Sequence, residues 1–89
     1  MTRLELNRLA PRGCLVRVKS DLTDHWFAVG VYALRMAEAV VCQLPEIAST
    51  DVVVARRTLK PAEIKQLSLK RLEALPCKVT KDGECVEPL

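Results

Sequence analysis

Hydrophobic and polar residues change their spacing along this chain, most clearly within its longest apolar stretch, residues 25–44 (HWFAVGVYALRMAEAVVCQL). Its first part, 26–32, combines every aromatic residue of the protein with valines and a glycine, which favours a strand. From Ala33 onward, good helix formers carry apolar residues at helical spacing, which predicts an amphipathic helix that ends at Pro45. The apolar face of this helix consists of Leu34, Ala37, Val41 and Leu44. The stretch therefore predicts a strand followed by a helix, and not one helix of the ~20 residues that cross a bilayer.

The segment before this stretch predicts the first strand of an antiparallel hairpin. Residues 14–19 (CLVRVK) alternate apolar and basic side chains, except at Leu15. One face of this strand carries Cys14, Val16 and Val18, and the other carries Arg17 and Lys19. Residues 20–24 have turn composition, so we expect the strand to pair with residues 25–31.

Residues 51–59 predict a third strand, because they open with three consecutive β-branched residues. Such a run suits a central strand that is buried from both sides, or from one side with an apolar neighbour on the other. The alternation of side chains then places Val53 toward the helices, with Val52 and Val54 sharing the opposite face.

A second helix is predicted after this strand. Pro61 suits the first helical position, and apolar spacing continues to Leu75, so we expect the helix to end at Pro76, with residues 68–69 as an alternative stop. Residues 77–86 contain a Lys-Asp-Gly turn signal between two short apolar runs, which indicates a short C-terminal hairpin.

This order of elements, β-β-α-β-α, predicts an α+β fold in a single domain that spans residues 1–89. Both helices are expected on one face of a mostly antiparallel sheet, as a two-layer sandwich. Residues 4–9 add the signal of one further short strand.

The size and composition of the chain favour association with a partner. With 89 residues and only 3% aromatic residues, the chain has a small core, and a second copy can supply the missing burial. Trp26 and Phe27 are neighbours in a strand and point to opposite faces, so the helices cover one of them and leave the other for a partner. The sequence therefore predicts a non-enzymatic protein-interaction module, a homodimer, with Trp26 and Phe27 as its interaction residues.

The four cysteines, Cys14, Cys42, Cys77 and Cys85, are expected to be reduced thiols in a cytoplasmic protein, because no apolar signal-peptide core precedes them. Cys42 is predicted to be a small buried apolar residue of the first helix. Cys77 and Cys85 are the closest pair and can be cross-strand neighbours, either as thiols or as a disulfide. Their spacing does not fit a structural zinc site, and the scattered glycines form no phosphate-binding loop. We expect no metal, cofactor or small-molecule substrate.

The single histidine, His25, is the residue best suited to general base catalysis, and it follows Asp24 directly. Neighbours in an extended segment point to opposite sides, so this carboxylate is not expected to orient the imidazole. Ser20 and Thr23 lie in a turn, where local hydrogen bonds account for their hydroxyl groups. The sequence therefore predicts no catalytic residues.

Charge supports an alternative function, nucleic-acid binding. The net charge is only +3, but residues 56–71 carry six basic residues against the single acid Glu63. The residues predicted to contact phosphates are Arg56, Arg57, Lys65, Lys70 and Arg71. No aromatic residue lies among them to stack on a base, and a solvated basic surface or self-association with the acidic middle of the chain explains them as well.

Overall fold

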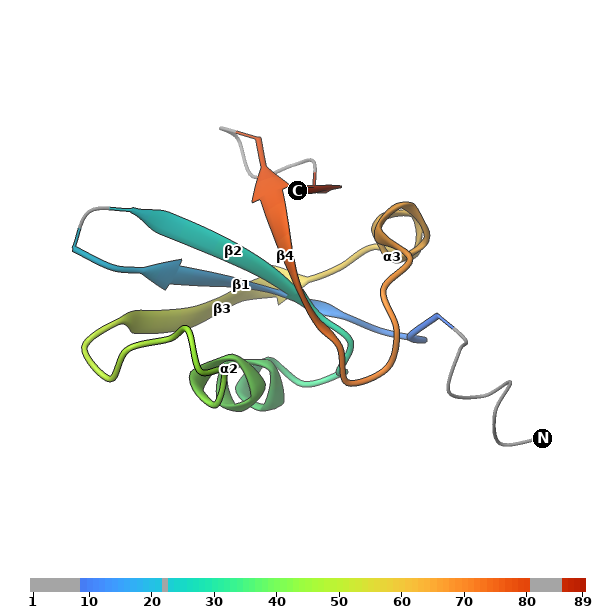
Figure 1. Ribbon diagram of the computed structural model, residues 1–89. Helices are drawn as coiled ribbons and strands as arrows, with labels where there is room; N and C mark the ends of the chain where they lie inside the picture. The colour runs from blue at the N-terminus through green and yellow to red at the C-terminus, as the bar shows by residue number, and fades with distance from the viewer. Residues whose placement is uncertain (1–8, 22, 81–85) are drawn as a thin grey trace.

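Figure 1 shows the fold as a computed structural model, which describes residues 9–21, 23–80 and 86–89. The described residues form a five-stranded antiparallel sheet, in the order β3-β1-β2-β4-β5, and two helices. In chain order the elements are β1 (Cys14–Lys19), β2 (Asp24–Val29), α2 (Leu34–Cys42), β3 (Val52–Thr58), α3 (Pro61–Leu67), β4 (Ala74–Val79) and β5 (Val86–Pro88). The α+β fold and its predicted order are therefore confirmed, with β4 and β5 as the C-terminal hairpin. The turn of this hairpin, residues 81–85, lies outside the described residues, as do residues 4–8 of the predicted strand segment 4–9. Leu9, its last residue, forms an isolated antiparallel bridge with Lys70.

The long apolar stretch divides as predicted. It enters the sheet as β2, leaves it at Val29, and begins α2 at Leu34. Within the described ranges, no helix has the length and apolarity needed to cross a membrane.

The two helices pack on opposite faces of the sheet (Figure 1), so the prediction that both share one face, as a two-layer sandwich, is not confirmed. Alternate residues of β1 show the division. Cys14, Val16 and Val18 pack in one buried cluster with residues of α2, whereas Leu15 packs in another with Ile64 of α3.

An extra residue in β3 explains why α3 lies on the second face. Leu15 pairs with Arg57 and the next residue, Val16, pairs with Ala55, so Arg56 is inserted as a bulge. The insertion reverses the alternation of side chains, and Arg57 points to the face opposite Ala55. The chain leaves the sheet on that face, where α3 begins.

The second helix ends earlier than Pro76, at Leu67, so the alternative stop is confirmed. Ser68 adopts a left-handed conformation with φ of 51°, which ends the helix and turns Leu69 into the core. Leu75 and Pro76 belong to β4. The predicted length was wrong because apolar spacing alone does not separate the end of a helix from the start of a buried strand.

Two apolar residues predicted to face the core from α2 are exposed instead. Ala37 and Val41 are buried as expected. Leu34 is the first residue of the helix and is 40% exposed. Cys42 is also exposed, because it lies about 100° around the helix from Val41. The prediction that Cys42 is buried was wrong.

β3 lies at an edge of the sheet, not in its centre as predicted. β1 lies in the interior of the sheet between β3 and β2, and β3 alternates half-buried with exposed residues. Glu38 of α2 covers part of this edge: its Oε2 accepts a hydrogen bond of 2.8 Å from the N–H of Ala55. A carboxylate placed there discourages another strand from pairing with the edge.

The three valines of β3 are expected to respond differently to alanine. Val53 packs against the α2 cluster, so Val53→Ala leaves a cavity and costs about 1–2 kcal/mol. Val52 and Val54 are exposed on the opposite face, and their substitution costs under about 1 kcal/mol in the monomer. Thermal melts of the three variants at low protein concentration measure the difference. Equal losses at all three positions would contradict the described packing.

Candidate interaction surface

Trp26 and Phe27, the two predicted interaction residues, point to opposite faces of β2, as period-two alternation requires. Phe27 is 4% exposed in the cluster beneath α2. Trp26 is half-buried on the other face. Only Trp26 is thus available to a partner at this position.

The neighbours of Trp26 follow from the register of three strands. Arg17 of β1 pairs with Trp26 on one side and with Val54 on the other. Two residues further along β1, Lys19 pairs with Asp24 and Val52. Residues paired directly across strands share a face. We call this surface the Trp26 face: Arg17, Lys19, Asp24, Trp26, Val52 and Val54.

Helix α3 covers only the other half of this sheet face. It packs over the row that contains Leu15 and Ala28. On the Trp26 face, Val52 is 56% exposed and Val54 is 38% exposed. These two valines stay exposed to solvent because α3 has only seven residues and packs over Leu15 and Ala28 instead.

The charged residues of the Trp26 face are arranged around Arg17. Its Nη2 lies 2.6 Å from Asp24 Oδ2, and its guanidinium carbon lies 5.8 Å from the centre of the Trp26 ring. Both partners fix the guanidinium beside the aromatic ring. The surface therefore combines apolar side chains with charges of both signs.

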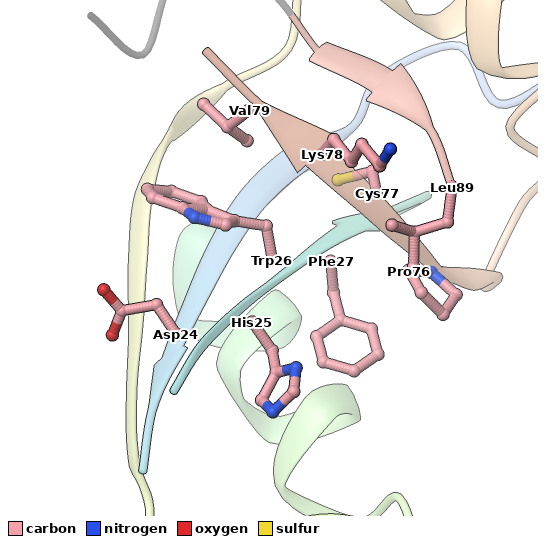
Figure 2. Close-up of a pocket in the computed structure, with 9 residues that line it drawn as sticks. All are labelled: Asp24, His25, Trp26, Phe27, Pro76, Cys77, Lys78, Val79 and Leu89. Carbon is pink, nitrogen blue, oxygen red and sulfur yellow. The ribbon is translucent and has the colours of Figure 1, made fainter. Parts of the chain in front are cut away.

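A hollow of about 350 Å³ adjoins Trp26, at the point where β2 and β4 diverge. The ladder between these strands ends at the pair Trp26 and Cys77, and beyond it Lys78 of β4 pairs with β5. Figure 2 shows Trp26 on one side of β2, toward Val79, with His25 and Phe27 on the other. The side chains that line the hollow therefore lie on opposite faces of β2 and do not converge on a common point.

His25 takes a hydroxyl partner and not its neighbouring carboxylate. Its Nε2 lies 3.0 Å from Thr23 Oγ1, which lies 3.1 Å from Ser20 Oγ. Asp24 instead binds Arg17 on the opposite face. Ser20 also donates to the Thr23 carbonyl at 2.9 Å, as expected of a turn. These contacts hold the turn between β1 and β2 together, and they give the imidazole no carboxylate that would orient it as a base.

The described cysteines are free thiols, and Cys85 lies outside the described residues. Burial raises the pKa of Cys77 to about 12, with a smaller contribution from the Glu63 carboxylate. Burial also raises the pKa of Cys14. Both thiols are therefore poor nucleophiles at neutral pH. Across the described ranges, no three residues of the metal-binding types lie close enough to hold an ion.

The five predicted phosphate-binding residues are spread over several elements. Arg57 is bound by Glu63, with both guanidinium nitrogens 2.8 Å from the carboxylate oxygens. Arg56 is the bulged residue of β3, and Lys65 lies exposed on α3. Lys70 and Arg71 lie in the turn before β4. Because Glu63 neutralises Arg57, the nucleic-acid alternative loses one of its central cations.

Comparison with known proteins gives no relative from which a function can be transferred. No family model matches the chain, and no curated protein or solved structure matches it. Function is therefore inferred from the residues of the chain itself.

The sequence predicted Trp26 and Phe27 as interaction residues but did not identify the surface around Trp26. The alternation in residues 14–19 already placed Arg17 and Lys19 away from the α2 core. The sequence did not predict that β3 lies at an edge of the sheet, where Val52 and Val54 share a face with Arg17 and Lys19.

Proposed function

We propose that this protein is a non-enzymatic protein-interaction module that associates with a second copy of itself through the Trp26 face. The observation that carries the proposal is the exposure of Val52 and Val54 on the same sheet face as Trp26, on a half of that face that neither described helix covers. Burial of such side chains against a partner is favourable by ~25 cal/mol per Å² of apolar surface.

Charge supports a second copy as the partner. The Trp26 face carries the cations Arg17 and Lys19 and the carboxylate of Asp24, so charges of both signs are present. A surface with both signs can complement itself across a twofold axis, whereas a surface with one sign repels its own copy. Six side chains are fewer than the roughly 20–30 residues a side of a standard interface, so we expect a weak dimer. The reduced thiols fit our expectation of a cytoplasmic protein.

Sedimentation velocity and light scattering over a concentration series from micromolar to millimolar test the proposal. We expect a monomer–dimer equilibrium, which the double substitution Val52→Asp and Val54→Asp weakens at least about tenfold, because it places charge in a desolvated interface. The matched control adds two acids on the exposed side of α3, at Ala62 and Gln66, and keeps the wild-type equilibrium.

A second variant separates loss of the interface from loss of the fold. Val52→Thr with Val54→Thr keeps the β-branched shape that suits a strand, and it is expected to weaken the dimer with little change in melting temperature. A wild-type protein that stays monomeric at millimolar concentration would show the proposal to be wrong. An equilibrium that neither double variant shifts would place the interface elsewhere.

A further inference from the structure

A second exposed apolar cluster lies at the other end of β2, where the connection to α2 meets the turn before β4. Tyr32 is 67% exposed, Leu72 is 70% exposed and Met36 is 40% exposed. These side chains line a hollow of about 160 Å³, together with Arg12 and Arg71. We call it the arginine hollow, because both charged residues that line it, among those described, are arginines.

Leu72 lies in a tight turn whose backbone conformation suits glycine better than leucine. Its φ of 61° lies in the left-handed region, where glycine or asparagine is the usual residue. The surrounding turn is fixed: the Glu73 N–H donates to the Lys70 carbonyl at 3.1 Å, and the Leu72 N–H donates to the Gly30 carbonyl at 2.9 Å. A leucine at this position is strained, and its exposed side chain gains little burial in return. The side chain is thus displayed outward at a conformational cost.

The residues around the hollow favour a protein partner over a nucleic acid. Tyrosine, methionine and arginine are enriched in the cores of protein interfaces. Single-stranded nucleic acid binds mainly to several aromatic platforms and a basic groove. The arginine hollow contains one aromatic ring, that of Tyr32, and the aliphatic side chains of Met36 and Leu72 line it as well. A sugar–phosphate backbone offers no apolar group that would pack against these aliphatic side chains.

Charge defines the chemistry of that partner. Arg12 and Arg71 are exposed, and Glu73, the carboxylate of the turn, is not among the residues that line the hollow. Its Oε1 accepts a hydrogen bond of 3.0 Å from the N–H of Lys70. A hollow with charge of one sign repels a copy of itself, unlike the Trp26 face. We propose that the arginine hollow binds an acidic peptide segment of another protein, with an apolar side chain of that segment inserted between Tyr32 and Leu72. This site is separate from the Trp26 face and does not depend on self-association.

Selection from a displayed library of random 12-residue peptides, on the full chain, tests the proposal. We expect the enriched peptides to combine Asp or Glu with a large apolar residue. A synthetic enriched peptide, labelled with fluorescein and titrated by anisotropy, then measures the affinity of the variants. Arg71→Glu reverses one charge and is expected to weaken binding at least about tenfold, because an attraction to the acidic residues of the peptide becomes a repulsion. Lys65→Glu makes the same charge change on α3 outside the hollow and should alter affinity less than about twofold.

Leu72→Gly distinguishes a binding role from a structural one. Glycine suits the left-handed backbone, so the variant is expected to keep or raise the melting temperature while it weakens peptide binding at least about tenfold. Peptides enriched without acidic residues, or no enrichment at all, would overturn the proposal. Binding of a labelled oligothymidine that Arg71→Glu abolishes, without enrichment of acidic peptides, would assign the hollow to nucleic acid instead.

Discussion

Gly30→Ala is expected to lower the free energy of unfolding by about 3 kcal/mol or more, because a side chain at this position collides with backbone atoms. A β-carbon on Gly30 would lie 2.1 Å from the carbonyl oxygen of Lys70. Gly30 also holds the turn before β4: its N–H donates to the Glu73 carbonyl at 2.8 Å, and its carbonyl accepts from Leu72 at 2.9 Å. The added methyl group has to displace this turn and break both hydrogen bonds.

Thermal denaturation measures this loss, since 1 kcal/mol corresponds to about 4–8 °C in a domain of this size. The variant should therefore melt at least about 12 °C below the wild type. Gly13→Ala is the matched control. A β-carbon there meets the side-chain methyl groups of Leu59 and Leu69, both at 2.9 Å, which can shift, so about 1–2 kcal/mol is expected. A Gly30→Ala protein as stable as the control would contradict the close approach of the turn.

Glu63→Gln is expected to cost about 2–3 kcal/mol at neutral pH, because the Glu63 carboxylate accepts three charge-assisted hydrogen bonds. Two come from Arg57 and one from the N–H of Lys60, all at 2.8 Å. The bond from Lys60 caps the start of α3, where the Lys60 side chain offers no acceptor. The variant thus weakens both the start of the helix and its attachment to β3.

The same carboxylate makes stability depend on pH. The hydrogen bonds from Arg57 are the main cause that lowers the pKa of Glu63, against the opposing effect of burial. Because the pKa of Glu63 is lower in the folded state, the carboxylate contributes its full stabilisation at a pH above the pKa of the unfolded state. This contribution is lost as the pH falls through the pKa of the folded state. Wild-type stability should therefore decline below about pH 4.3, and this part of the decline should be missing in Glu63→Gln.

Urea denaturation at pH 7 and at steps down to acid pH measures both effects. Asp24→Asn provides the control, because its ion pair with Arg17 has side chains that are 41% and 36% exposed. An exposed pair contributes little, so we expect a change below about 1 kcal/mol. Acid profiles of wild type and Glu63→Gln that run parallel would contradict the role of the carboxylate.

Much of the local structure was determined by the sequence alone. The division of the long apolar stretch follows from its glycine and its change of period, and β2 and α2 lie on either side of Gly30. The alternation in residues 14–19 determined which side chains of β1 share a face. The opposite directions of Trp26 and Phe27 follow from the same period of two. These features depend on the conformational preferences and the spacing of residues that are close in the sequence, so the sequence pattern is sufficient to predict them.

The tertiary structure decided which of these surfaces remain open. One inserted residue, Arg56, turns the end of β3 to the face opposite α2, and the ion pair between Arg57 and Glu63 holds α3 there. Among the described strands β3 pairs only with β1, and Val52 and Val54 are exposed on this edge strand. Strand order and helix placement depend on contacts between residues far apart in the chain, so no local pattern specifies them. The sequence therefore determined which elements form, and only the packing of those elements decided that Trp26, and not Phe27, stays accessible to a partner.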